Sequence, residues 1–353
     1  MRSFVHARAI GRLVLACVAL APGLAIAQSE PVWPVKNKMV GKGDSKSENV
    51  SGIACVSNSG FPRRCMVIDD ELQSAQLVTV YDGAIVAGPS IPLTDDQHDG
   101  KALELDGEGV AYENGFFYVI GSHGHPRDKA KKLDPVTDAD KIRARIAASS
   151  QLIRIRVHPV EGYPVTVTGA RSEVPEIART AKLKEIIRAE PVLAPFVDKR
   201  LEANGATIEG IAVRGDRVFA GFRGPVVNGN RAAILSVPVA ALFGTEPAAS
   251  TLHLLSLKPG HGIRDLAALP HGLLVLTGPM ADTGGGTYSV YWWDGATDTP
   301  KLLKDLPPYK RDGDELKPEA ILPLNQTSAG LRVLILFDGA KEGGPRAIEV
   351  AKP

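Results

Sequence analysis

The stretch TIEGIAVRGDRVFAGFRGP, from Thr207 to Pro225, decides the fold. It places an acid, Glu209, at the start of a short strand of small apolar residues. A tight Arg-Gly-Asp turn follows, and a second apolar strand ends on Arg223. Glycine tolerates the positive φ that such turns require, so the stretch predicts an antiparallel hairpin with an acid and an arginine at the same end.

Versions of this hairpin recur along the chain. The first-strand pattern appears again at 50–56, 107–112, 263–269 and 318–324. Each copy is followed by turn residues, a second apolar strand, a third strand and, in most copies, a weaker fourth strand. A repeat of roughly 40 to 55 residues is typical of propeller blades. We predict an all-β fold, a single β-propeller of five four-stranded blades, and a hidden sixth blade is the alternative.

Two segments interrupt the blade pattern within or after the second blade. The charged segment near 127–150 predicts a loop and a short helix at 138–148, and the segment 173–206 has apolar residues at helical spacing. Val165 to Thr168 is the expected outer strand of the second blade. The last blade runs out of chain after three strands, so we expect the N-terminal strand, Val35 to Val40, to supply its outer strand and close the ring.

The first 27 residues have the pattern of a signal peptide. Arg2, Arg8 and Arg12 precede an apolar run, and Ala25-Ile26-Ala27 offers small residues for cleavage. We therefore expect a periplasmic or secreted protein whose propeller domain spans 28–353, and no membrane span. Removing three of 41 Lys+Arg and none of 40 Asp+Glu leaves 38 against 40, a net charge of −2 that gives no reason to expect nucleic acid.

Two cysteines, Cys55 and Cys65, remain after the signal segment. They flank a short loop, which places them on neighbouring antiparallel strands where a disulfide forms easily. An exported protein meets the oxidising conditions that such a bridge needs. Two buried free thiols are the alternative, and the spacing excludes a CxxC-type metal site.

Blade topology brings together side chains that are far apart in the sequence. The start of a first strand, the end of a second strand and the following loops lie on one face, so Glu209 and Arg223 are expected to be neighbours. The same placement assembles a ring of polar residues around the central funnel, and these are the predicted ligand-binding residues: Asp70, Glu108, His123, Glu209, Arg223, Arg264, Asp265, Glu319 and Asp338. Alternatively, each acid caps backbone N–H groups or pairs with a neighbouring arginine.

Carboxylates that converge on one funnel repel one another unless a cation intervenes. Hard oxygen ligands are what Ca²⁺ takes, so we predict a Ca²⁺ site made by Glu108, Glu209, Asp265 and Glu319. His123 and His125 form a His-x-His pair, but no third histidine lies near them in the sequence, so a zinc site is the weaker interpretation.

The chain resembles a bacterial family that carries the domain of unknown function numbered 3616. The resemblance rests on short motifs spread over most of the chain: Ser51-Gly52-Ile53-Ala54, Val67-Ile68-Asp69-Asp70-Glu71, Glu108-Gly109-Val110-Ala111, Gly121-Ser122-His123, Ile208-Glu209-Gly210-Ile211-Ala212, Gly221-Phe222-Arg223-Gly224-Pro225 and Gly262-Ile263-Arg264-Asp265-Leu266. The family implies a β-propeller-like domain and brings no established activity. More remotely, the repeated Glu-Gly-hydrophobic-Ala strand is similar to esterase-like and phytase-like propellers, which implies Ca²⁺-dependent hydrolysis of a phosphoester.

The leading hypothesis is therefore a periplasmic propeller that binds a small polar ligand or Ca²⁺ in an acidic funnel. Hydrolysis of a phosphoester or other ester is a consequence to test, with Arg223 and Arg264 holding an anionic group of the substrate. A non-catalytic interaction module of the cell envelope is the alternative.

Overall fold

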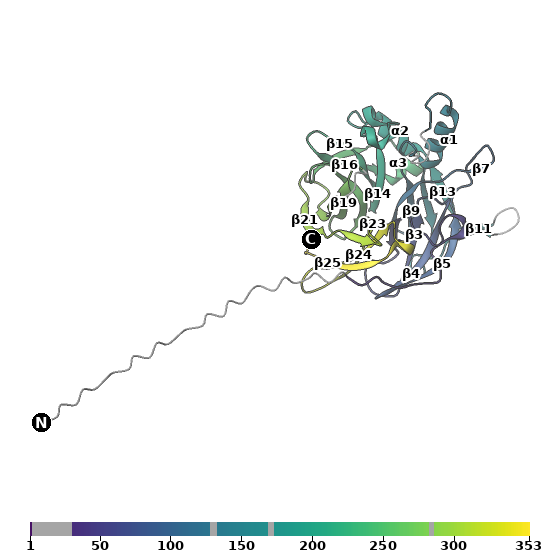
Figure 1. Cartoon of the computed structure of the whole chain (residues 1–353). Coiled ribbons are helices and arrows are strands. Elements are labelled where there is room, and N and C mark those ends of the chain that lie inside the picture. The colour runs from purple at the N-terminus through teal and green to yellow at the C-terminus, as the bar shows by residue number, and fades with distance from the viewer. Residues whose placement is uncertain (2–29, 128–132, 169–172, 282–285) are drawn as a thin grey trace. The chain divides into compact units, whose positions relative to one another are not determined.

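A computed structural model describes residues 1, 30–127, 133–168, 173–281 and 286–353, so the predicted signal segment lies outside the described residues apart from Met1. From Pro31 onward the chain is one compact unit. Its sheets stand around a common axis as a five-bladed β-propeller (Figure 1). No helix within these ranges is long and apolar enough to cross a membrane.

The first two blades are four-stranded antiparallel sheets whose first strand lies nearest the axis. Blade one consists of β2 (Val50–Cys55), β3 (Arg63–Asp69), β4 (Ser74–Tyr81) and β5 (Ala84–Pro92), with the short β1 (Val35–Lys36) added to its outer edge. Blade two consists of β8 (Gly107–Glu113), β9 (Phe116–Gly121), β10 (Leu152–Arg156) and β13 (Ile177–Thr180).

The remaining three blades repeat this order. Blade three consists of β14 (Thr207–Arg214), β15 (Arg217–Val227), β16 (Arg231–Pro238) and β17 (Thr251–Ser256). Blade four consists of β18 (His261–Ala268), β19 (Leu273–Pro279), β20 (Tyr288–Trp293) and β21 (Lys301–Leu306). Blade five consists of β23 (Asp314–Gln326), β24 (Leu331–Asp338) and β25 (Arg346–Val350), and β22 (Tyr309–Arg311) pairs with the start of β23.

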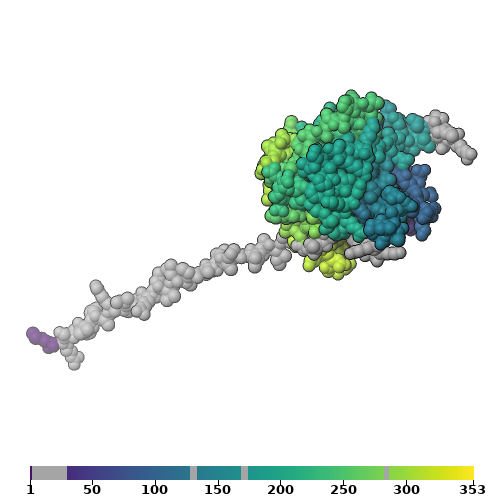
Figure 2. Space-filling view, turned by 90° about the horizontal axis from the view of Figure 1, so that it is seen from above, coloured from purple at the N-terminus to yellow at the C-terminus, as the bar shows by residue number. Residues whose placement is uncertain are grey.

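Short helices and two hairpins decorate the blades. Between β5 and β8 lies a hairpin of β6 (Gln97–His98) and β7 (Lys101–Ala102), and β11 (Thr166–Thr168) pairs with β12 (Glu173–Pro175). The helices are α1 (Ala139–Ser149), α2 (Lys182–Ala189) and α3 (Val239–Phe243), and the 3₁₀ turns are η1 (Lys42–Asp44), η2 (Ala194–Phe196), η3 (Leu201–Ala203) and η4 (Lys341–Gly343). In the view from above, teal atoms from the middle of the chain cover much of the visible face of the propeller (Figure 2).

Apolar side chains fill the spaces between neighbouring blades. Five clusters of buried described residues each join two adjacent blades, for example Ile68 of blade one with Val119 of blade two. The cluster containing Val67 and Leu336 joins the first blade to the last, so the ring is closed by packing as well as by strand pairing. Burial of apolar area is the main favourable term for such a fold.

The innermost strands approach one another closely, and glycine permits this at two blade junctions. A Cβ on Gly52 of β2 would lie 2.7 Å from the Cα of Gly109 in β8. A Cβ on Gly210 of β14 would lie 2.9 Å from the backbone of Asp265 in β18. Backbone contact at this distance leaves no room for a side chain.

The predicted disulfide is confirmed: Cys55 of β2 and Cys65 of β3 stand opposite each other in the sheet and are joined. The N-terminal segment also links the last blade to the first, but through other residues than expected. Val32 pairs with Arg346 of β25, whereas β1 pairs in parallel with β5 at the outer edge of blade one. The expectation that Val35 to Val40 forms the outer strand of the last blade is therefore wrong.

The outer strand of blade two also differs from expectation. Thr166–Thr168 belongs to the separate β11–β12 hairpin, and β13 pairs with β10 instead. Ile177, which the helical spacing assigned to a helix, begins β13. The helical spacing of apolar residues is correct for α2, whose Leu183 and Ile187 are buried. The predicted helix begins several residues too early, because Ile177 lies in a strand.

The close contact between β2 and β8 predicts a loss of stability in Gly52→Ala. We expect the free energy of unfolding to fall by about 1–3 kcal/mol, because the new methyl group meets rigid backbone. Chemical denaturation measures this change, with Ser51→Ala on the same strand as the matched control that should unfold near the wild-type midpoint. Equal midpoints for Gly52→Ala and wild type would contradict the packing.

Candidate functional site

Each inner strand has a one-residue bulge at the same point in all five blades. In β14, Ile208 pairs with Phe222 and Gly210 pairs with Gly221, so Glu209 is the extra residue of a β-bulge. The corresponding residues of the other blades are Ser51, Glu108, Arg264 and Glu319. A bulge redirects a side chain away from the regular ladder. These five bulges place one polar side chain per blade at the head of the central channel.

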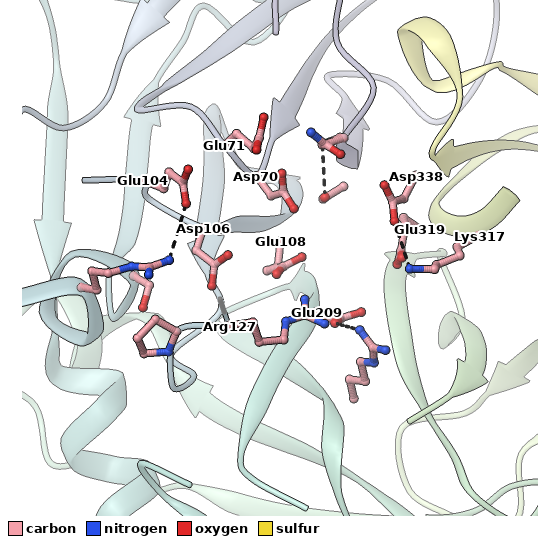
Figure 3. Close-up of a pocket in the computed structure, with 16 residues that line it drawn as sticks. Asp70, Glu71, Glu104, Asp106, Glu108, Arg127, Glu209, Lys317, Glu319 and Asp338 are labelled. Atoms are coloured by element: carbon pink, nitrogen blue, oxygen red, sulfur yellow. Dashed lines mark hydrogen bonds and ion pairs between the residues drawn. The ribbon is translucent and has the colours of Figure 1, made fainter. Parts of the chain in front are cut away.

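A pocket opens at this end of the channel. Its volume is about 260 Å³, close to the lower limit for small-molecule sites. The close-up shows acidic side chains from several blades around it (Figure 3). Its lining residues are Asn49, Ser51, Asp70, Glu71, Glu104, Asp106, Glu108, Pro126, Arg127, Arg145, Ser149, Glu209, Arg223, Lys317, Glu319 and Asp338.

Part of this charge is neutralised by a buried ion-pair network across blades three to five. Nη1 of Arg223 lies 2.8 Å from Oε1 of Glu209, as the strand topology predicts. Arg264 contacts Oε2 of Glu209 at 2.9 Å and pairs with both carboxylate oxygens of Glu319. Burial alone would raise the pKa of Glu209, but the two arginines outweigh it and hold that pKa below its usual range. Glu209 is therefore a fixed carboxylate.

Glu108 occupies the same bulge position in the neighbouring blade and has the opposite environment. Its side chain is 6% exposed, and no hydrogen bond or ion pair of its carboxyl group occurs among the described residues. Burial, together with repulsion by Glu209, Asp106 and Asp70, raises its pKa well above the usual range, and Arg127 offsets this only in part. Glu108 is therefore directed into the pocket without pairing with any residue that the structure describes (Figure 3).

Two aspartates stand beside Glu108. Burial raises the pKa of Asp106, with partial compensation by a hydrogen bond from Ser122. Burial and the charges of Asp106 and Asp69 raise the pKa of Asp70, and its Oδ1 is buried without a hydrogen-bond partner among the described residues. The blade-one and blade-two side of the pocket is therefore a cluster of carboxyl groups that favours the protonated form or a bound cation.

Six of the nine predicted site residues line the pocket, namely Asp70, Glu108, Glu209, Arg223, Glu319 and Asp338. Arg264 lies just beneath, paired with Glu209 and Glu319. Asp265 points toward blade five instead, where it accepts hydrogen bonds from the backbone N–H groups of Leu266 and Ile321 at 2.7 and 2.8 Å. It joins two blades, so the structure does not bring the four predicted Ca²⁺ ligands together.

His123 also lies outside the pocket lining. Its Nδ1 is 2.8 Å from the backbone oxygen of Gly121, and burial lowers its pKa to about 3. Lys184 of α2 donates a hydrogen bond to the backbone oxygen of His123 at 2.6 Å. The ring therefore stays neutral at physiological pH and fixes the loop after β9. Within the described part of the chain, no three His, Cys, Asp or Glu side chains are already grouped to hold a metal ion.

Several lining residues were not among the predicted ones. Glu104, Asp106 and Glu108 alternate along the approach to β8, and Lys317 and Glu319 do so in β23. The backbone between them is not regular, because Asp106 has a φ of 53° and Glu108 and Glu319 are bulge residues, so alternation alone does not place these side chains in the pocket. Arg127 and Arg145 come from the insertion after β9, and no sequence pattern indicated that they reach the pocket.

The comparisons with known proteins identify a family. The family described as "Protein of unknown function (DUF3616)" matches residues 63–347, so the chain belongs to it. No curated protein sequence matches the chain.

Solved structures with a similar fold have very different sequences. A GH43 β-1,3-galactosidase with galactodeoxynojirimycin is 11% identical to this chain. The alignment covers 90% of this chain and 92% of the galactosidase, with a TM-score of 0.43. An α-L-arabinofuranosidase from Podospora anserina in complex with cellotriose is 10% identical, with coverages of 92% and 98% and a TM-score of 0.44. The Nup133 β-propeller domain of Vanderwaltozyma polyspora is 7% identical, with coverages of 85% and 71% and a TM-score of 0.35. These similarities carry no argument about activity.

The unpaired state of Glu108 predicts a pH-dependent effect of Glu108→Gln. The pKa of the Glu108 carboxyl group is higher in the folded protein than in the unfolded chain, where it is about 4. Its contribution to stability is therefore fully present below about pH 4 and is lost as the pH rises through the pKa of the folded protein. The variant should therefore gain stability relative to wild type as the pH increases from 5 to 8. Denaturation at several pH values measures this difference.

The matched control is Glu246→Gln, an exposed acid distant from the pocket lining. Its stability difference from wild type should stay constant over the same pH range. A Glu108→Gln variant that behaves in the same way would show that Glu108 is not a destabilised buried carboxyl group.

Proposed function

We propose that the central pocket binds a small polar ligand that carries positive charge, either Ca²⁺ or an organic ammonium group. The observation that supports this most strongly is Glu108, a buried carboxyl group directed into the pocket without a partner among the described residues. A buried polar group without a partner carries a desolvation cost. A cation that pairs with Glu108 would remove that cost.

The balance of charges supports a cation over an anion. Eight carboxyl groups line the pocket against four basic side chains. Three of the basic side chains already lie near carboxylates: Arg223 at 2.8 Å from Glu209, Lys317 at 3.4 Å from Asp338, and Arg145 at 3.8 Å from Glu104. Asp70 and Glu108 have no ion-pair partner in the described part of the chain. The pocket therefore presents several carboxylate oxygens to a ligand, and most of its cationic groups already lie near a carboxylate.

The lining also disfavours an apolar or aromatic ligand. Pro126 is the one apolar residue among the described residues of the lining, which contains no aromatic ring. Sites for apolar ligands are lined mostly by hydrophobic and aromatic side chains. A compact and strongly hydrated ligand fits this lining better.

For Ca²⁺, the ligand set we propose differs from that expected from the sequence. Glu108 is kept, and Asp70 and Asp106 take the place of Glu209, Asp265 and Glu319, because those three are engaged by arginines or by backbone N–H groups. Ca²⁺ accepts flexible sets of oxygen ligands that include water. Since these carboxylates are not pre-grouped around one point, binding requires them to close on the ion.

A thermal melt separates the two kinds of cation. We expect Ca²⁺ or a small diamine to raise the melting temperature of the wild type, with a stabilisation of about 2.7 kcal/mol at a hundredfold excess over Kd. Because the carboxyl groups must ionise to bind, the shift should be larger at pH 8 than at pH 5. Glu108→Gln should remove most of it, and Glu246→Gln should retain it. No shift with either cation would contradict the proposal.

Hydrolysis of an ester or phosphoester is a second candidate function. It is favoured by the opposite environments of two neighbouring carboxyl groups, because burial and nearby acids raise the pKa of Glu108, whereas Arg223 and Arg264 lower the pKa of Glu209. Groups with pKa values separated in this way are typical of acid–base catalysis. Glu108 would give its proton to the leaving oxygen as that bond breaks, water would form the new bond to the acyl carbon or phosphorus, and the proton lost by that water would return to the Glu108 carboxylate.

A panel of chromogenic esters and phosphoesters tests this candidate. Glu108→Gln should lower kcat by about a hundredfold or more, since the amide has no proton to transfer, while Glu246→Gln should match wild type. A wild-type protein that turns over no member of the panel, with or without Ca²⁺, would reject the hydrolase. The non-catalytic envelope module would then be the better account.

We infer a periplasmic or secreted location for this activity. The Cys55–Cys65 disulfide supports it, because such bridges persist in oxidising compartments. Cell fractionation and mass spectrometry of the mature N-terminus check it, and a cytosolic protein that retains Met1 would contradict it.

A further inference from the structure

A second cavity adjoins the central pocket and carries the opposite charge. Its volume is about 470 Å³, and it lies between η1, the β6–β7 hairpin and α1. Figure 1 shows α1 and the hairpin on the same side of the propeller, and α1 contacts β6. Four of its lining residues are lysine or arginine, against two acids: Lys42, Lys101, Lys141 and Arg145, with Asp99 and Glu104. We call this cavity the basic cleft.

The basic residues come from three separate elements that face one another. Lys141 and Arg145 are four residues apart in α1, a spacing that places both on one side of the helix. Lys101 lies in β7 across the cleft, and Lys42 lies in η1. Lys101 and Lys141 are exposed and have no hydrogen-bond or ion-pair partner within the described ranges. Two cationic groups therefore face this cavity, and no described side chain pairs with either of them.

The basic cleft adjoins the central pocket. Glu104 and Arg145 line both cavities. Lys42 donates a hydrogen bond to Glu104 at 2.6 Å, which also raises the pKa of Lys42, and Arg145 lies 3.8 Å from the other oxygen of Glu104. Glu104 thus lies at the boundary between the two cavities, and its negative charge is neutralised by Lys42 and Arg145 of the basic cleft. An elongated ligand that passes this boundary moves from carboxyl groups to ammonium and guanidinium groups.

We propose that the basic cleft is an anion-binding subsite that holds a phosphate or other oxyanion group of the same ligand whose cationic part occupies the central pocket. The guanidinium of Arg145 and the ammonium groups of Lys101 and Lys141 are suited to oxyanions, which accept several charge-assisted hydrogen bonds at once. The ligand class is therefore dipolar, with an amine or a bound Ca²⁺ at one end and an oxyanion at the other. The single-ligand part of this inference rests on the proposed function, whereas the anion subsite stands on the basic cleft alone.

In this proposal the anionic group is bound by other residues than those predicted from the sequence. Arg223 and Arg264 were expected to hold an anionic group, but both are 2% exposed and contact Glu209 in the buried network. Lys101 and Lys141 make no such contact among the described residues and face the solvent-accessible cleft. The anionic group therefore belongs beside the acidic pocket and not at its base.

Binding of inorganic phosphate to the intact protein, measured by calorimetry at low ionic strength, tests the subsite. The double variant Lys101→Gln/Lys141→Gln should bind phosphate about tenfold more weakly or worse. The control Lys36→Gln/Lys352→Gln makes the same change in net charge at exposed positions elsewhere and should bind as wild type does. Equal affinity in the two double variants would overturn the subsite. All four lysines are exposed, so a melt comparable to wild type confirms that folding is retained.

Aminoalkyl phosphates of increasing chain length test the single ligand. One length should bind more tightly than inorganic phosphate, and Glu108→Gln should abolish that advantage. If no length exceeds phosphate in the wild type, the single-ligand inference is wrong. If the advantage survives Glu108→Gln but is lost in Lys101→Gln/Lys141→Gln, the anion subsite stands and the proposed cation site in the central pocket fails.

Discussion

The extra residue in each of the five inner strands is the constraint on which the site depends. An inner strand is crowded by its two neighbours, so a regular ladder would direct its side chains only into blade interfaces or toward small gaps. The bulge turns one residue per blade out of the ladder and toward the axis. The next residue then faces the adjacent blade, where Gly52, Gly109 and Gly210 leave room for backbone contact. Packing and the polar ring are thus two consequences of one backbone feature.

The five bulge residues do not share one role. Arg264 pairs with both Glu209 and Glu319, and Arg223 pairs with Glu209, so these charges are neutralised within the fold. Glu108 has the same backbone setting without a basic neighbour that pairs with it in the described part of the chain. A buried charge without a partner lowers the stability of a fold. A protein that keeps such an acid therefore does so at a cost in stability. This contrast between the two halves of the ring is what supports our proposal that the ligand binds on the acidic side.

Much of the fold was predictable from the sequence because the hairpin motif repeats in register. The motif located the inner strands, the number of blades, the disulfide partners and the contact between Glu209 and Arg223. It fails where the pattern is weak. Outer strands carry little periodicity, so the sequence predicts Val165 to Thr168 as the edge strand of blade two, whereas β13 occupies that edge.

The site was predictable only in part. Asp265 was grouped with the channel acids because it follows Arg264 in the motif, yet it occupies the position of Gly210, one residue past the bulge, and so faces the next blade. A shift of one residue reverses the direction of a strand side chain. Glu104 and Asp106 precede β8, where Asp106 has a φ of 53°, so strand alternation does not place them in the pocket. Arg127 and Arg145 reach the pocket through the fold of an insertion that no strand pattern describes.

The protonation state of the Glu108 carboxyl group tests the central claim most directly. Carbon-13 NMR of glutamate side-chain carboxyl groups, assigned by comparison with Glu108→Gln, follows that state as the pH and the cation concentration change. The account predicts that Glu108 titrates well above the usual glutamate range and releases its proton when Ca²⁺ or an amine binds. A Glu108 signal that titrates in the usual range, or that stays unchanged when the cation is added, would contradict the account.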